Sequence, residues 1–243
     1  RVLFRSTSLN VSGSANLEDI ACIFTPISSI NLNGLVHLKR LDFYSSELTT
    51  LDLTLLPNLE YLNFNRNNLT ALNISGLERL HTLYCANNHL TSLNLSGLTS
   101  LATIHCNDNQ LTALDFQHSR YLYDLDCSKN SLTSLYIKNN TAETILKFSN
   151  NQNIQYVCAD SGQLADVQNL VTSYGYYFTC AVNDTCFTLS NPDFEISEDF
   201  KLYPNPVEGI VNIASSKTIS SITIFNTLGQ MVLETANPGQ VID

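Results

Sequence analysis

The strongest constraint on this chain is a repeat of 21 residues. Four positions recur at that interval, three as leucine and one as asparagine. The ladders are Leu48, Leu69, Leu90, Leu111 and Leu132; Leu51, Leu72, Leu93, Leu114 and Leu135; Leu38, Leu59, Leu80, Leu101 and Leu122; and Asn67, Asn88, Asn109, Asn130 and Asn151. Such a period is typical of a solenoid, in which each unit buries its apolar face against its neighbours. The pattern indicates a binding surface more than a catalyst.

Apolar and polar residues alternate in the first half of each unit. Leu62 and Phe64 alternate with Asn63 and Asn65, which predicts a strand with one buried face. Asn67 ends that strand, where its side chain can satisfy backbone groups of neighbouring coils. The unit resembles the leucine-rich repeat. The resemblance implies a solenoid with one parallel β-sheet on its concave face, short turns opposite and little helix.

The repeat register covers residues 17–160. Units begin at Leu17, Leu38, Leu59, Leu80, Leu101 and Leu122, and Thr25 replaces the asparagine of the first unit. A seventh unit begins at Glu143 and slips by one residue, so that Ile154, Val157 and Ala159 take the places of Leu132, Leu135 and Ile137. We expect residues 1–16 to be an N-terminal remnant or cap. Because Arg1 is not a natural start, we expect the N-terminus to have been processed or trimmed.

The outward positions of the predicted strands form three columns along the concave face. They are Asp19, Arg40, Tyr61, Thr82, Thr103, Asp124 and Ile145; Ala21, Asp42, Asn63, Tyr84, His105, Asp126 and Lys147; and Ile23, Tyr44, Asn65, Ala86, Asn107, Ser128 and Ser149. One candidate binding group contains tyrosines and asparagines: Tyr44, Tyr61, Asn63, Asn65 and Tyr84. A second is charged: His105, Asp124, Asp126 and Lys147. The alternative is that Asp126 offsets Lys147 and the tyrosines only cover apolar surface.

Charge and motifs exclude several classes of function. The formal net charge is −10, with −3 over residues 1–160 and −7 over residues 161–243. No basic stripe favours nucleic acid, and no apolar run is long enough to span a membrane. We find no metal motif, phosphate loop or nucleophile elbow, and the outward carboxylates lie on an open face without pocket walls. We therefore predict no enzyme, no catalytic residue, no metal and no cofactor.

The seven cysteines divide by register. Cys22, Cys85, Cys106 and Cys127 occupy the position that holds Phe43, Phe64 and Phe148 in sister units. A metal or disulfide is one interpretation of that stack; we favour buried, reduced side chains that pack as small hydrophobes. Cys158, Cys180 and Cys186 lie after the last full unit. Our preferred disulfide joins Cys158 to Cys180, with Cys186 left over.

A solenoid needs a covered end, and residues 161–182 suit a C-terminal cap. Leu164, Val167, Leu170 and Val171 have helical spacing, with Ser161 as a candidate N-cap and Gly175 as a candidate stop. Tyr176, Tyr177 and Phe178 follow as an apolar plug. Residues 183–199 are rich in Asn, Asp, Glu and Ser, which predicts a linker.

Residues 200–243 are expected to form a small antiparallel β segment. Val211 and Ile213 alternate, as do Ile222 and Ile224, and Gly229 marks a turn. The segment resembles the C-terminal sorting domain of the type IX secretion system of Bacteroidota, through Tyr203, Pro204, Asn205 and Pro206 and through residues 224–230. It stops at Asp243 before the family's final strands, so we expect a truncated domain. The resemblance implies contact with the secretion machinery and release to, or attachment at, the outer cell surface.

Two functions remain open at this stage. The repeats also resemble surface proteins of the same bacteria and internalin-like proteins. The first hypothesis is a secreted or cell-surface recognition and adhesion module that binds protein or glycan through the concave face. The alternative is a rigid spacer or accessory domain within a longer exported protein whose activity lies upstream.

Overall fold

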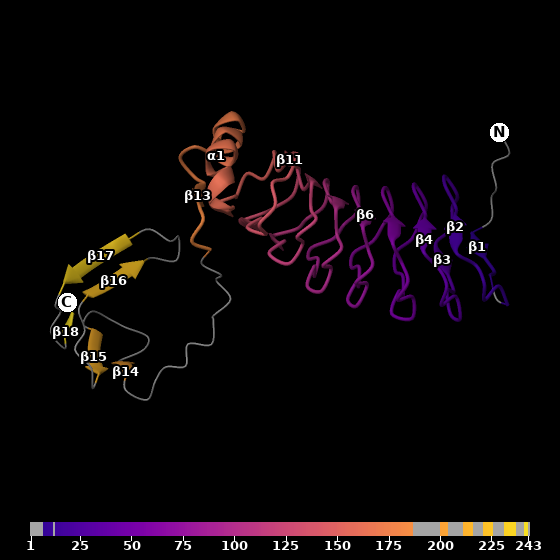
Figure 1. Cartoon of the computed structure of the whole chain (residues 1–243), viewed down its shortest axis with the longest axis horizontal. Coiled ribbons are helices and arrows are strands. Elements are labelled where there is room, and N and C mark those ends of the chain that lie inside the picture. Colours follow the sequence, from indigo (N-terminus) through magenta and orange to yellow (C-terminus); the bar gives the residue numbers. More distant parts are fainter. Residues whose placement is uncertain are drawn as a thin grey trace. The chain divides into compact units, whose positions relative to one another are not determined.

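The computed structural model describes residues 7–11 and 13–186 and the strand segments 200–203, 211–215, 221–225, 231–236 and 241–242. Its contacts divide the chain into two units, Arg1–Cys186 and Phe187–Asp243. The first unit is a stack of coils, as the repeat predicts (Figure 1). It has the leucine-rich-repeat solenoid fold, with little helix.

One side of the first unit is a parallel sheet of seven strands. They are β2 (Asp19–Ala21), β4 (Arg40–Asp42), β5 (Tyr61–Asn63), β6 (Thr82–Tyr84), β7 (Thr103–His105), β9 (Asp124–Asp126) and β11 (Ile145–Lys147). Neighbouring strands pair one period apart, as Leu62 pairs with Leu83 and Ile104 with Leu125. The predicted concave sheet and its register are confirmed.

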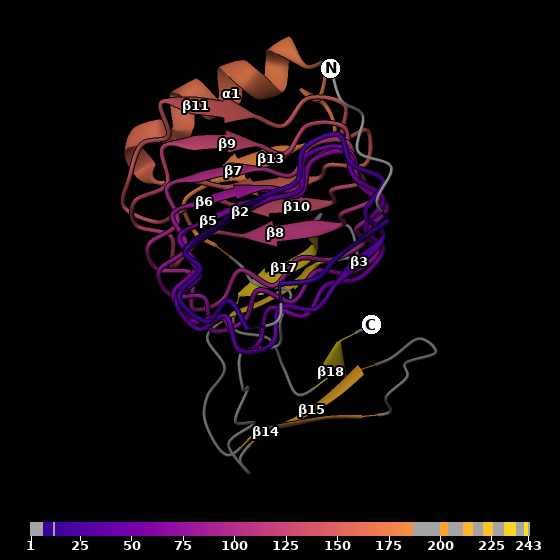
Figure 2. The ribbon, with the colours of Figure 1, turned by 90° about the vertical axis from the view of Figure 1, so that its right-hand side faces the viewer.

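A second parallel sheet lies in the other half of the coils, where only turns were expected. It contains β8 (Ala113–Asp115), β10 (Ser134–Tyr136), β12 (Tyr156–Cys158) and β13 (Ala181–Asn183) (Figure 2). Ser134 pairs with Tyr156, an offset of one residue beyond the period, which is the slip predicted in the seventh unit. At the other end β1 (Ser8–Leu9) pairs with β3 (Ser29–Ile30), so the repeat register reaches back to Ser8.

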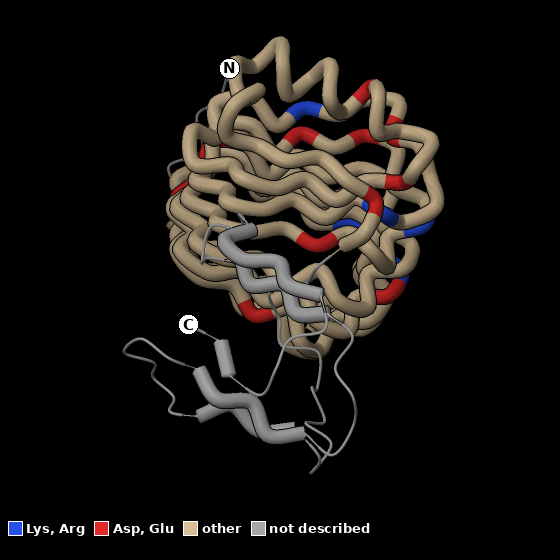
Figure 3. The backbone as a smooth tube through the Cα atoms, turned by 90° about the vertical axis from the view of Figure 1, so that its left-hand side faces the viewer, with Lys and Arg blue, Asp and Glu red and all other residues tan. Residues whose placement is uncertain are grey.

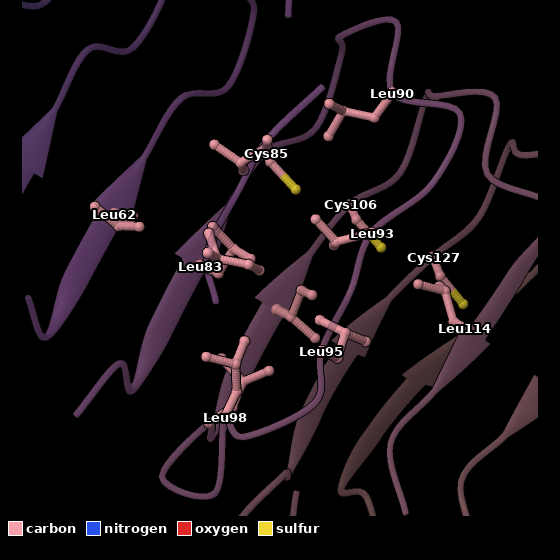
Figure 4. Close-up of a cluster of buried hydrophobic side chains, with 14 of the residues drawn as sticks. Leu62, Leu83, Cys85, Leu90, Leu93, Leu95, Leu98, Cys106, Leu114 and Cys127 are labelled. Carbon is pink, nitrogen blue, oxygen red and sulfur yellow. The ribbon is translucent and has the colours of Figure 1, made fainter. Parts of the chain in front are cut away.

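The core consists of the predicted ladders. Leucines of all three ladders are buried at most positions, and Cys85, Cys106 and Cys127 are fully buried free thiols on three adjacent coils (Figure 4). Burial raises the pKa of Cys85 to about 12, and it also raises the pKa values of Cys106 and Cys127. A thiol that stays protonated packs as a small hydrophobe, as predicted for this position.

The asparagine ladder joins each coil to the one before it. Asn88 Oδ1 accepts a hydrogen bond from the Leu69 backbone N–H at 3.0 Å. Its Nδ2 donates to the carbonyls of Phe64 at 2.8 Å and Cys85 at 3.1 Å. The same three kinds of bond recur at Asn67, Asn109, Asn130 and Asn151. Buried backbone groups at the turn are thereby satisfied by a side chain.

The C-terminal end of the stack is closed by a coil that contains a helix. A 3-10 turn, η1 (Ser161–Gln163), precedes α1 (Leu164–Ser173), so Ser161 is not the N-cap that the sequence indicated. Gly175, at φ +80°, follows the helix as the predicted stop. β13 then pairs with β12, and the Tyr176 hydroxyl accepts a hydrogen bond from Asn151 N–H at 2.8 Å. The cap thus satisfies the last member of the asparagine ladder.

The expected aromatic plug and disulfide are both corrected. Tyr176 is buried, but Tyr177 and Phe178 are 61% and 94% exposed, so the plug is one residue. Cys158 is bonded to Cys186, and Cys180 is a free, buried thiol. The prediction of a Cys158–Cys180 pair was wrong because the cap does not end at residue 182.

Residues 183–186 remain attached to the solenoid. Tyr156 Oη donates to Asn183 Oδ1 at 2.7 Å, and Lys138 Nζ donates to the Asp184 carbonyl at 2.7 Å. These contacts carry the chain alongside β12, where Cys186 reaches Cys158 with a Cα–Cα distance of 5.4 Å.

A partly buried carboxylate also connects the cap to the last repeats. Glu143 accepts hydrogen bonds from Asn139 Nδ2 at 3.0 Å and from Gln163 Nε2 at 2.7 Å. Desolvation raises the pKa of Glu143, although those two donors oppose the shift. The contact therefore joins a repeat turn to η1 through a group that is costly to ionise.

The second unit contains short antiparallel strands. β14 (Phe200–Tyr203) and β18 (Val241–Ile242) both pair with β15 (Val211–Ser215), and β16 (Ser221–Phe225) pairs with β17 (Met231–Ala236). β16 and β17 flank the predicted hairpin of residues 224–230, of which residues 226–230 lie outside the described residues. Tyr203 ends β14, whereas Pro204, Asn205, Pro206 and Gly229 lie outside the described residues.

Candidate binding face

The outward side of the seven-stranded sheet, called the sheet face below, carries the predicted columns. Strand pairing aligns Asp19, Arg40, Tyr61, Thr82, Thr103, Asp124 and Ile145 in one column and Ala21, Asp42, Asn63, Tyr84, His105, Asp126 and Lys147 in the next. Several members are nevertheless buried, among them Asp42, Asn63 and Thr103. A column assignment from sequence does not reveal this burial.

Arg40 organises the N-terminal half of the sheet face. Its guanidinium donates to Asp42 Oδ2 at 2.7 Å and lies 3.6 Å from Asp19 Oδ2. The same guanidinium lies over the Tyr61 ring, 3.9 Å from its centroid. A cation over a tyrosine face is attractive, and the carboxylate fixes its position. Tyr61 is therefore held from one side before any partner binds.

Aromatic contacts continue the arrangement across the next strands. Tyr61 and Tyr84 meet edge to face with centroids 5.9 Å apart, and the His105 ring lies 5.0 Å from that of Tyr84. His105 Nε2 is 3.1 Å from Asp124 Oδ1. Asp42, Arg40, Tyr61, Tyr84, His105 and Asp124 thus form one continuous line, which we call the central row. The sequence predicted two separate groups, and the structure joins members of both.

Tyr84 lies in the middle of the central row. Burial raises the pKa of Tyr84, and Tyr61, Asp124 and Tyr123 raise it further through their electrostatic influence. The phenol therefore stays protonated and can donate a hydrogen bond at physiological pH. Tyr84 combines a packed ring with a polar tip, a combination enriched at protein interfaces.

The remaining predicted site residues lie outside the central row. Tyr44 contacts Phe24 at a centroid distance of 5.2 Å and lies under Arg66 at 5.9 Å. Asn63 and Asn65 both accept hydrogen bonds from backbone groups. Asn63 Oδ1 accepts from the Asn65 N–H at 3.2 Å, and Asn65 Oδ1 accepts from the Ala86 N–H at 2.6 Å.

The second charged pair on the sheet face is already satisfied within the molecule. Asp126 Oδ2 lies 3.8 Å from Lys147 Nζ, and Asp126 Oδ1 accepts from the Ser128 hydroxyl at 2.6 Å. This arrangement is the offsetting pair that was the alternative interpretation of these two residues. Asp124 differs, because its described partner is a histidine.

Two exposed tyrosines were not among the residues predicted from the sequence. Tyr121 and Tyr123 are 68% and 52% exposed and flank the buried Leu122. They precede the strand β9, outside the three columns that were considered. Tyr121 lines a shallow hollow with His81, Ser100 and Ala102. The sequence did contain an indication of these exposed tyrosines. Other units have smaller or charged residues at the same two repeat positions.

The described residues contain no group of three or more His, Cys, Asp or Glu side chains arranged to hold a metal ion. Acidic and basic positions are interspersed on the coils rather than segregated by sign (Figure 3).

Comparison with known families identifies two segments. Residues 78–118 match a model of leucine-rich repeats in two copies, and residues 201–241 match the secretion system C-terminal sorting domain. The sorting domain indicates export through type IX secretion to the cell surface or beyond. No helix among the described residues has the length and apolarity that a membrane span requires.

Solved structures support the fold. A functional domain of InlJ from Listeria monocytogenes, described as including a cysteine ladder, is 29% identical with a TM-score of 0.58, over 64% of this chain and 37% of that chain. A leucine-rich-repeat protein of Leptospira interrogans is 18% identical with a TM-score of 0.51, over 69% and 49% of the two chains. No curated protein gives a significant match. The chain thus spans about a third to a half of the proteins that it resembles, which share its leucine-rich-repeat fold.

Proposed function

We propose that this chain is a recognition module of an exported protein of the Bacteroidota, and that it binds a protein partner through the sheet face. The leucine-rich-repeat fold is typically a non-enzymatic interaction scaffold, and the sorting domain supports an extracellular setting. The observation that carries the proposal is the central row. Its residues contact one another across five strands, from β4 to β9, yet the repeat does not require them.

The energetic argument rests on pre-organisation. Arg40 and His105 contact Tyr61 and Tyr84 from opposite ends, so the two rings lose little freedom when a partner covers them. Tyrosine and arginine are enriched among residues whose truncation weakens interfaces most. Exposed Tyr121 and Tyr123 extend this surface towards the strand entries. Adhesion to another cell surface is one use of such a face.

The test is a binding screen with the chain as bait against extracellular proteins and, in parallel, a glycan array. Each hit is measured again with Tyr61→Ala plus Tyr84→Ala. Tyr177→Ala is the control, because Tyr177 is an exposed tyrosine of the cap. We expect a protein hit whose binding is lost only in the double variant. Hits confined to glycans would replace the protein partner by a carbohydrate, and hits that survive the double variant would contradict binding through the central row.

A second candidate is the rigid spacer. It is supported by the continuity of the stack, in which the asparagine ladder and the parallel sheet link every coil from β2 to β11. A spacer requires that stiffness but makes no use of exposed aromatic rings. Failure of every screen would favour this second function.

A further inference from the structure

The two ends of the central row contain the same chemistry, but one end has its cation and the other does not. At the Arg40 end, a guanidinium lies over Tyr61 and is held by the Asp42 carboxylate at 2.7 Å. At the opposite end, the His105 ring lies 5.0 Å from that of Tyr84, and His105 Nε2 is 3.1 Å from Asp124 Oδ1. No Lys or Arg pairs with Asp124 anywhere in the described part of the chain.

Asp124 is unusual among the inner carboxylates of the sheet face. Asp42 pairs with Arg40, and Asp126 lies near Lys147, so both have a basic partner. Asp124 has one oxygen beside His105, and a histidine carries a full charge only when it is protonated. Its side chain is 16% exposed, so the carboxylate is partly removed from water yet reachable. A charge in that position gains from a cationic partner more than a fully solvated one does.

The surroundings suit a flat or extended cation. Thr82 and Thr103 lie between Tyr61 and Asp124 in the same column, so the floor of this part of the face has small side chains. Tyr84 stands in the adjacent column, and Tyr123 precedes Asp124 at the rim. Tyrosine faces attract guanidinium and ammonium groups, as the Arg40–Tyr61 contact demonstrates within this molecule. Residues 1–160 have a formal net charge of −3, which also favours encounter with a basic partner.

We propose that the protein partner inserts a basic side chain, arginine or lysine, beside Tyr84 so that its cation pairs with Asp124. This assignment rests on the proposed function and specifies the chemistry of its partner. It places the cation of the partner at one end of the central row and the internal cation, Arg40, at the other. The partner therefore carries at least one basic residue at the centre of its binding surface.

The first test uses the wild-type chain and two peptide probes. Acetyl-Gly-Arg-Gly-amide and the same peptide with citrulline have nearly the same shape, but only arginine is charged. Proton and carbon NMR of the tyrosine and histidine rings reports binding at Tyr84, Tyr123 and His105. We expect the arginine peptide to shift these signals at a concentration at least about fivefold lower than the citrulline peptide requires. Added salt should reduce this difference in the required concentration. Equal binding of both peptides would overturn the proposal.

The second test uses matched substitutions. Asp124→Asn removes the charge but keeps an oxygen for His105, and Asp115→Asn makes the same change on β8 of the other sheet. We expect the first to weaken binding of the arginine peptide at least about fivefold and the second to leave it unchanged. If a captured partner is lost in Tyr61→Ala plus Tyr84→Ala but bound normally by Asp124→Asn, the sheet face remains the binding surface and cation docking is wrong.

Discussion

The buried ladders and the sheet face follow opposite rules within the same coils. Inside, one position is leucine in five successive units, and the asparagines make the same three kinds of hydrogen bond each time. On the sheet face, residue types change from strand to strand. Three aligned positions on neighbouring strands are Asn63, Tyr84 and His105. Repetition therefore marks what the fold needs. Variation marks where the chain can be specific.

The comparison also separates two kinds of polar residue. Ladder asparagines are buried or partly buried and bond to backbone groups of two coils, so their loss damages the stack. Arg40, His105 and Asp124 bond to other side chains at a partly exposed surface, so their loss changes the surface more than the stack. Substitutions of ladder residues should therefore lower stability, whereas substitutions on the sheet face should mainly lower binding affinity.

The largest expected effect is in the asparagine ladder. Asn88→Ala leaves the buried Leu69 N–H without its acceptor and removes two donated bonds, which should destabilise the chain by about 3–5 kcal/mol. Asn94→Ala, in an exposed turn, removes bonds to Ser96 only and should cost less than about 1 kcal/mol. Urea unfolding monitored by circular dichroism measures both. Equal losses would show that the ladder is not a special feature of the fold.

A core leucine should follow closely. Leu93→Ala truncates a side chain that is 8% exposed, and we expect a loss of roughly 2–5 kcal/mol from lost burial and the resulting cavity. Leu55 lies in a turn, at the repeat position of Gly76, and is 58% exposed, so Leu55→Ala is the control and should cost under about 0.5 kcal/mol. If Leu93→Ala costs no more than the control, the inner register is wrong.

The cap disulfide comes next. It closes a sequence separation of 28 residues, for which chain entropy predicts about 2–4 kcal/mol of stabilisation. We expect Cys158→Ala and Cys186→Ala to lower stability by similar amounts. Digestion without reductant, followed by mass spectrometry, should recover Cys158 linked to Cys186. Native thiol labelling should leave Cys85, Cys106, Cys127 and Cys180 unmodified, and a peptide linking Cys158 to Cys180 would refute the cap described above.

The smallest expected effect is a pH dependence at Glu143. Its folded pKa is raised above the ordinary value, so the folded state binds this proton more tightly than the unfolded state. Its contribution to stability is therefore present below the ordinary pKa of 4.5 and is lost as pH rises through the folded pKa. Unfolding free energies of the wild type and Glu143→Gln between pH 4 and 8 test this. The difference between them should change with pH in that sense, and a constant difference would contradict the assignment.

Much of the fold was predictable because the repeat imposes it. The period and the alternation of apolar residues predict the strands and the leucine core. They also predict the role of Asn88 and the burial of Cys106, because each coil packs against its neighbours through the same repeat positions. The second sheet was not predictable in this way, because β8, β10 and β12 have an apolar residue at the same repeat position as coils that form turns there. The left-handed residue before the ladder asparagines was missed too, since Arg66, Asn87 and Lys129 have φ between 53° and 57°.

The candidate site was only half predictable. Sequence register placed Tyr61, Tyr84, His105 and Asp124 on one face, but contacts between neighbouring strands depend on side-chain direction. The Arg40–Tyr61 contact and the burial of Asp42 beneath it could not be read from a column. Cys186 was missed for a related reason, because hydrogen bonds of residues 183–186 to β12 and Lys138 are not encoded in a local pattern.

The central claim is that the sheet face serves binding while the ladders serve folding. Its most direct test measures partner affinity and unfolding free energy together for Tyr61→Ala plus Tyr84→Ala and for Leu93→Ala. We predict that the tyrosine variant loses at least about 30-fold in affinity, the factor that corresponds to about 2 kcal/mol, with a smaller loss of stability than the leucine variant. Unchanged affinity in the tyrosine variant, at temperatures where both variants remain folded, would contradict the account.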